Sequence, residues 1–157
     1  MSNTTADASD NLLKVLVYSS NRLVREKIKA ALGRRIAADL PEITITEFAT
    51  DEALIRALDA EKFDAAVMDG EAVPGGMGIC HQIKDEIIDA PPVVILVARP
   101  QDAWLATWSR ADAVVGFPID PLRLPGDVAQ VIRDRRNSVV TVLSSVDVVP
   151  GVGSRHD

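Results

Sequence analysis

Polar side chains stand at the carboxyl ends of two predicted strands, the place where parallel sheets usually carry their chemistry. Ser19 and Ser20 follow the apolar run Lys14–Tyr18, and Asp69 closes the run Phe63–Asp69. The carboxyl ends of parallel strands meet at one edge of a sheet, so these side chains should lie close together. The two hydroxyls can then hydrogen-bond the carboxylate, an arrangement that satisfies buried polar groups without any chemistry.

Metal-dependent chemistry is poorly supported at this edge. Mg²⁺ binds chiefly to carboxylates and phosphate, and Glu71 is the only other carboxylate near Asp69 in the sequence. The next two strand ends carry Val97 and Phe117, whose side chains cannot donate a hydrogen bond to an anion. We therefore expect weak or absent Mg²⁺ binding, no cofactor and no enzymatic turnover.

Other motifs give weaker signals. The run Gly75–Gly78 lacks the Lys-Ser or Lys-Thr pair of a nucleotide loop, and we expect a flexible turn. Cys80 and His81 are adjacent, but no further Cys and His cluster completes a metal site, so Cys80 is expected to pack in a helix. The amides of Ser19–Arg22, at the start of a predicted helix, leave a small-anion site open, although a plain N-cap is the simpler interpretation.

The composition places the chain among ordinary globular proteins. Its 157 residues fit one domain, and 47% hydrophobic with 25% charged residues is close to the average for folded domains. A formal net charge of -6 argues against binding to nucleic acid or anionic membranes, which needs clustered Lys and Arg. The single cysteine cannot form an internal disulfide, so we expect a reducing cytoplasm. No apolar run approaches the roughly 18 residues that cross a bilayer.

Short apolar runs alternate with longer stretches whose apolar residues recur every three or four positions. This alternation predicts repeated βα units around a parallel sheet. The predicted strands are Lys14–Tyr18, Ile43–Phe48, Phe63–Asp69, Val93–Ala98 and Ala113–Gly116. The first, third and fourth are apolar on both faces, as the middle of a covered sheet requires, whereas the second alternates as an edge strand does. The predicted fold class is α/β, with one domain over residues 12–136.

Five helices are predicted between and after these strands. The first carries the stripe Val24, Ile28, Leu32 and Ile36. The others are Asp51–Ala60, a helix bearing Ile79, Ile83 and Ile87, the short helix Asp102–Ser109, and a last helix bearing Leu124, Val128 and Val131 or Ile132. Residues 1–11 have the polar composition of a flexible tail. Residues 137–157 are apolar, nearly uncharged and rich in β-forming residues, and we expect either an added edge strand or a disordered extension.

The order of these elements resembles the receiver domain of bacterial response regulators, the CheY-like family. The likeness covers about residues 12–136 and rests on Val15–Ser20, Phe63–Asp69, Val93–Arg99 and Phe117–Pro121. It implies a flavodoxin-like, doubly wound sheet of five parallel strands in the order 2-1-3-4-5, with five helices. It also implies a cis peptide between Phe117 and Pro118, since the cis form before proline is tolerated at modest cost.

The resemblance also assigns roles at the strand ends. In active receivers a phosphoryl group is carried by an aspartate that corresponds to Asp69. The acidic pair that holds Mg²⁺ in that family is replaced here by Ser19 and Ser20. The family has a Ser or Thr at the end of the fourth strand, and Val97 stands there in this chain. The family's lysine after the fifth strand is replaced by Phe117. One preorganised contact of this kind is worth on the order of a hundredfold or more in rate, so the resemblance implies an atypical, degenerate receiver in which phosphorylation is very slow.

Trp104 and Trp108 are the only tryptophans and stand four residues apart, on one face of the predicted helix Asp102–Ser109. Large aromatic rings are common in cores and are also enriched at protein contacts. In receivers the fourth helix, fifth strand and fifth helix form the usual partner and dimer face, which makes this pair the interface candidate.

The leading hypothesis is a free-standing signalling protein that acts through protein partners, a homodimer among them, without phosphorylation. Two alternatives stay open: a two-component phosphorelay receiver with residual acceptance on Asp69, and the small-anion binder.

Overall fold

A computed structural model of the chain describes the backbone of residues 11–152 and the side chains of residues 11–104 and 107–138. Within this range the strands form one parallel sheet in the order β2-β1-β3-β4-β5. The strands are β1 (Leu13–Tyr18), β2 (Ile43–Phe48), β3 (Ala65–Asp69), β4 (Val93–Val97) and β5 (Ala113–Gly116). The predicted fold class and strand order are confirmed. Asp69, at the end of β3, is in register with Leu96 of β4.

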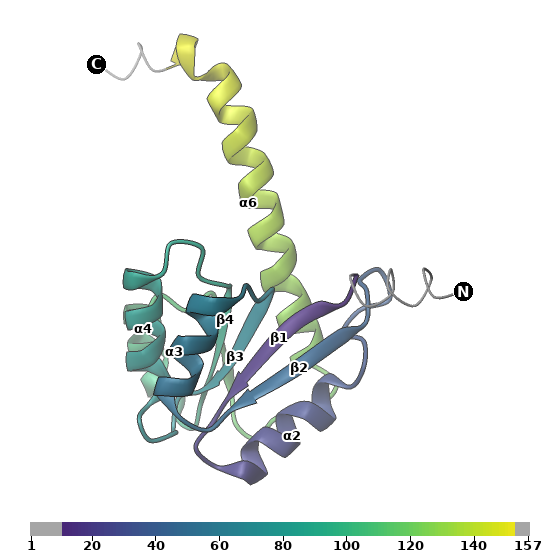
Figure 1. The fold of residues 1–157 in the computed structure, drawn as a ribbon, viewed down its shortest axis with the longest axis vertical. Coiled ribbons are helices and arrows are strands. Elements are labelled where there is room, and N and C mark those ends of the chain that lie inside the picture. Colours follow the sequence, from purple (N-terminus) through teal and green to yellow (C-terminus); the bar gives the residue numbers. More distant parts are fainter. Residues whose placement is uncertain (1–10, 153–157) are drawn as a thin grey trace.

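Helices cover both faces of the sheet (Figure 1). They are α2 (Arg22–Leu32), α3 (Asp51–Ala60), α4 (Gly76–Glu86), the 3-10 helix η1 (Pro100–Asp102), α5 (Ala103–Trp108) and α6 (Leu124–Val152). Alternate residues of β1 belong to the two cores. Val15 and Val17 pack in the core under α2 and α6, whereas Leu16 and Tyr18 pack in the core under α3 and α4. This separation follows from the two-residue side-chain period of a strand.

Local signals set the ends of α2. The Asn21 side chain accepts a hydrogen bond from the Leu23 amide, and Gly33 adopts a φ of 62° directly after the last helical residue. Glycine adopts a positive φ without steric cost, so it ends the helix before Ile36. The predicted stripe is therefore one residue too long: Ile36 is buried, with 6% of its surface exposed, but it lies in the loop that follows the helix.

The prediction of a flexible turn at Gly75–Gly78 is wrong. Gly75 is the N-cap of α4, and the next three residues form the first turn of this helix. Further along, α4 buries Ile79 and Ile83 against the sheet. Burial of each such side chain contributes about 1.5–3 kcal/mol, which outweighs the roughly 1 kcal/mol that a glycine costs in a helix.

The carboxyl-terminal region also departs from the prediction. Residues 137–152 form neither an added strand nor a disordered extension, because they continue α6, which projects beyond the sheet (Figure 1). Once a helix is nucleated and packed, each further residue gains a hydrogen bond, and Val or Thr costs only about 0.7 kcal/mol or less relative to Ala. Despite its 29 residues, α6 is not a candidate membrane span, nor is any other helix in the described range. Residues 1–10 and 153–157 of the predicted tails lie outside the described residues.

Candidate functional site

Asp69 ends β3 at the carboxyl edge of the sheet and is buried, with 3% of its surface exposed. The Ser19 hydroxyl donates a hydrogen bond to its Oδ2 over 2.7 Å, and the Glu71 amide donates one to its Oδ1 over 2.8 Å. Each carboxylate oxygen therefore has a donor from the chain itself. These bonds offset much of the cost of burying a carboxylate away from water.

The two serines have different roles. Ser19 is fully buried, and its Oγ also accepts a hydrogen bond from the Asn21 amide over 3.0 Å. Ser20 is exposed, and its Oγ accepts a hydrogen bond from the Val73 amide over 2.9 Å. The predicted hydrogen bond to Asp69 is confirmed for Ser19 and wrong for Ser20, whose hydroxyl instead joins the loop after β3 to the end of β1.

The Glu71 carboxylate is directed to a neighbouring loop. Its Oε2 accepts a hydrogen bond from the Ala98 amide over 3.2 Å, just beyond the end of β4. In the described part of the chain, no three His, Cys, Asp or Glu side chains are grouped so that they could hold a metal ion. Mg²⁺ requires near-octahedral oxygen ligands and gives up its waters reluctantly, so Asp69 offers it a poor site. Weak Mg²⁺ binding stays a prediction.

Val97 and Phe117 make the neighbouring strand ends apolar. Val97 is buried, with 4% of its surface exposed, in the core under α3 and α4. The Phe117 amide donates a hydrogen bond to the Val97 carbonyl over 2.9 Å, and the ring packs on the core under α2 and α6. Phe117 also lines a groove of about 620 Å³ beside α2. The Phe117–Pro118 peptide is cis, as the resemblance implies, and so is Val73–Pro74.

Tyr18 was not among the predicted site residues, yet it anchors the loop after β3. The side chain is fully buried, and its hydroxyl donates a hydrogen bond to the Pro74 carbonyl over 2.6 Å. Burial raises the pKa of Tyr18, and the nearby charges of Asp51 and Asp69 raise it further. The only sequence signal for this role is a hydroxyl-bearing residue directly before Ser19, at the end of the apolar run Val15–Val17.

Comparison with known proteins decides the family, although no family model matches the chain. Two uncharacterized response regulatory proteins from two strains of Mycobacterium tuberculosis are each 48% identical to it over 126 residues, which cover 80% of this chain and 95% of theirs. The chain belongs to the response regulator family. It is a receiver domain of two-component signalling, as the sequence resemblance implies.

Solved receiver domains share the fold of this receiver. The signal receiver domain of a putative LuxO repressor protein from Vibrio parahaemolyticus matches with a TM-score of 0.68 at 18% identity, over 83% of this chain and 97% of that one. The BeF3-activated DrrB receiver domain matches with a TM-score of 0.64 at 21% identity, over 78% of this chain and 98% of that one. At these identities the likeness supports the CheY-like fold alone.

Two weaker candidate sites have structural roles in the receiver. The Asn21 amide donates to Ser19, and the Leu23 amide donates to the Asn21 side chain, so these donors at the start of α2 are already used within the chain. This favours the plain N-cap over a small-anion site. Cys80 is fully buried in α4, and burial raises its pKa to about 11, which keeps the thiol protonated at neutral pH.

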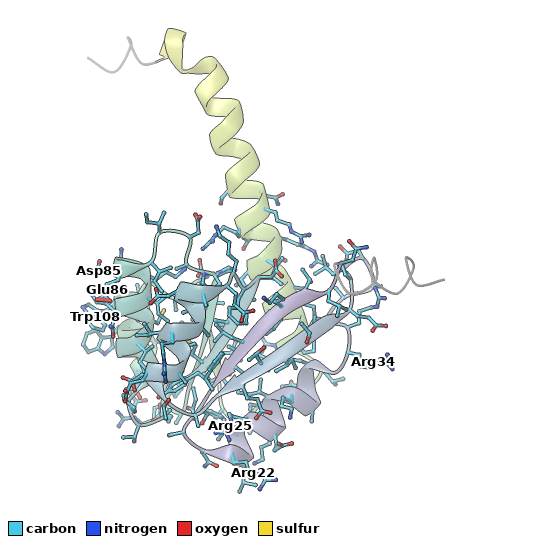
Figure 2. All side chains as sticks on the ribbon, in the orientation of Figure 1. Arg22, Arg25, Arg34, Asp85, Glu86 and Trp108 are labelled. Atoms are coloured by element: carbon cyan, nitrogen blue, oxygen red, sulfur yellow. The ribbon has the colours of Figure 1, made fainter. Side chains whose placement is uncertain are left out.

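Trp104 and Trp108 of the receiver are exposed, with 67% and 52% of their surfaces accessible. The Trp108 ring stacks on that of His81 in α4, with centroids 4.2 Å apart and planes inclined by 7°. His81 Nδ1 lies 3.2 Å from the Trp108 carbonyl, and since a carbonyl only accepts, Nδ1 carries the proton. Figure 2 shows Trp108 on the outside of the domain. We call the surface formed by the two tryptophans and His81 the tryptophan face.

Proposed function

We propose that this receiver signals through protein contacts and does not depend on phosphorylation of Asp69. The observation that carries the proposal is the bonding of Asp69, whose buried carboxylate accepts hydrogen bonds from Ser19 and Glu71, one on each oxygen. A carboxylate nucleophile must bring one oxygen to the phosphorus of the donor. Here each oxygen already accepts a hydrogen bond and only 3% of the residue surface is exposed, so a phosphodonor has little access to the carboxylate.

Charge makes the transfer harder still. A phosphoryl group brings roughly -1.5 to -2 charge, and phosphoryl transfer is catalysed almost entirely by positioning and by cations and donors that stabilise this charge. The positions that the resemblance assigns to these contacts carry uncharged side chains: Ser19, Ser20, Val97 and Phe117. Very slow phosphorylation is the expected result.

The test is incubation of the full chain with a small phosphodonor such as acetyl phosphate and Mg²⁺, followed by intact-mass measurement. We expect the native chain to stay unmodified over the time in which a typical receiver is fully phosphorylated. Asp69→Asn is the matched control, since it keeps the side-chain shape and removes the acceptor. A stoichiometric phosphoryl adduct that is present on the native chain and absent from Asp69→Asn would show that the proposal is wrong. The same result would establish the alternative of a phosphorelay receiver.

We further propose that the tryptophan face is the surface that contacts protein partners in the cytoplasm, a second copy of the chain among them. Exposed aromatic rings contribute large buried areas at protein contacts and are typical of binding hot spots. The net charge of -6 supports a protein partner over nucleic acid.

Sedimentation over a range of concentrations tests the homodimer, and photo-cross-linking from position 103, an exposed residue beside Trp104 at the start of α5, tests other partners in cells. We expect the combined Trp104→Ala and Trp108→Ala variant to lose association and cross-links. Ile88→Ala, at a side chain with 98% of its surface exposed outside this face, is the control and should behave as the native chain. Equal association and cross-linking by the three chains would refute the assignment of this face.

A further inference from the structure

Glu71 connects Asp69 to the strand that leads to the tryptophan face. Its backbone amide donates to Asp69 Oδ1 over 2.8 Å, while its side-chain Oε2 accepts from the Ala98 amide over 3.2 Å. Asp69 is in register with Leu96, so Ala98 lies two residues past that point, directly after the end of β4. One residue therefore joins the loop after β3 to the loop after β4.

A second set of contacts continues from Ala98 to α5. The next residue, Arg99, donates from Nε and Nη2 to the two carboxylate oxygens of Asp102, each over 3.0 Å. Asp102 is buried, with 8% of its surface exposed, and it ends η1 directly before α5. The hydrogen bond and charge of Asp102 raise the pKa of Arg99, and the charge of Glu71 raises it further, so the Glu71 carboxylate lies within electrostatic range of this pair.

The Ala98 amide is the kind of donor that an anion at this edge would use. It lies directly after the end of β4, and it donates to a side chain instead of to the backbone of a neighbouring strand. Backbone amides at the edge of a sheet commonly bind anionic groups. In this chain the acceptor is the Glu71 carboxylate, which carries a full negative charge without any covalent modification. A bond with an ionised acceptor is stronger than one between neutral groups.

From this arrangement we propose that the Glu71 carboxylate acts as a permanent internal anion that holds Ala98–Asp102, and with it α5 and the tryptophan face, in one arrangement. The proposal rests on the proposed function, because it explains how a receiver can present its partner surface without a signal at Asp69. Glu71 is a positioning residue in this account, since it acts on the tryptophan face through the loop after β4.

The test is hydrogen exchange of assigned backbone amides by NMR in the full chain. Glu71→Ala removes the acceptor, and we expect the Ala98 amide to exchange about three- to tenfold faster, because an exposed bond of this kind protects only modestly. Amide chemical shifts should change from Ala98 through α5, and the two indole N–H signals should move with them. Glu71→Gln keeps an acceptor of similar shape without the charge, and it should give a smaller increase in exchange.

Glu26→Ala is the matched control, since Glu26 is an exposed acid of α2, on the other face of the sheet, and pairs with Lys29 on its own helix. It should leave the Ala98 exchange rate and the α5 shifts unchanged. Unaltered exchange at Ala98 in Glu71→Ala, or equal changes in Glu26→Ala, would overturn the proposal. The mass measurement with a phosphodonor is independent of this result, so failure of the internal anion and failure of the phosphorylation-independent function are distinguishable.

Discussion

Replacing Ser19 by Ala tests how much the hydrogen bonds around Asp69 contribute to the stability of the fold. The Ser19 hydroxyl is fully buried, donates to Asp69 over 2.7 Å and accepts from the Asn21 amide over 3.0 Å. A hydrogen bond to a charged group contributes about 1.5–3 kcal/mol and an ordinary one about 0.5–1.5 kcal/mol. Because both partners stay in place without their bond, we expect the free energy of unfolding to fall by about 3 kcal/mol. In a chain of this size the melting midpoint should fall by about 6–12 °C.

Urea unfolding followed by circular dichroism measures the loss, with Ser20→Ala as the control. The Ser20 hydroxyl accepts a bond from Val73 at an exposed position, so its removal should cost less than about 1 kcal/mol. A double-mutant cycle with Asp69→Ala isolates the bond itself, and Ser19→Ala should cost at least about 1.5 kcal/mol less in that background. Equal losses for the two serine variants, or a cycle with no coupling, would refute the reasoning.

Further predictions concern the strand and loop around the site. Burial raises the pKa of Tyr18, the only tyrosine, above its ordinary 10.0. The protonated Tyr18 hydroxyl therefore contributes its full stabilisation below pH 10, and this stabilisation is lost as the pH rises through the folded-state pKa. Tyr18→Phe should flatten this alkaline loss in pH-dependent urea unfolding, and an unchanged slope would contradict the assignment. Gly70→Ala should destabilise by about 1–3 kcal/mol, since a Cβ would lie 2.6 Å from the Leu96 carbonyl oxygen. At Gly78 an added Cβ would meet no atom within 4 Å apart from its own helix backbone and chain neighbours, so Gly78→Ala should stabilise α4 by about 0.5–1 kcal/mol. Similar melting shifts for the two variants would contradict the packing argument.

The sheet could be predicted from the sequence because its signal is local and repeated. Val93–Val97 is apolar at every position, and Ile43–Phe48 alternates, so the central and edge strands are distinguished by which faces they bury. The end of α2 was missed by one turn, because a single Gly33 with positive φ overrides the continuing apolar stripe. The prediction from composition was wrong for residues 137–152, because the helix continues through residues that favour strands.

The site was predictable to the extent that strand ends determine it. The bond between Ser19 and Asp69 joins the ends of adjacent parallel strands, so sheet topology alone brings them together. The contacts of Tyr18 with Pro74 and of Glu71 with Ala98 depend on the conformations of two loops. No periodicity encodes a loop conformation, and such contacts become visible only when the loops are placed in three dimensions.

The uncharged residues at the strand ends also contribute to the stability of the fold. Two carboxylates about 4 Å apart repel by about 4 kcal/mol at an effective dielectric constant of 20, so an acidic neighbour of Asp69 needs a cation, whereas Ser19 supplies a hydrogen bond. Val97 is buried and the Phe117 ring packs on a core, and burial of such side chains contributes about 1.5–3 kcal/mol each, while a buried ammonium would need a charged partner. Active sites commonly cost stability, and the loss of their charged groups relieves that cost. Under the proposed function, these contacts stabilise the receiver without a cation or a transferred group, and this stability allows it to present one fixed surface to a protein partner.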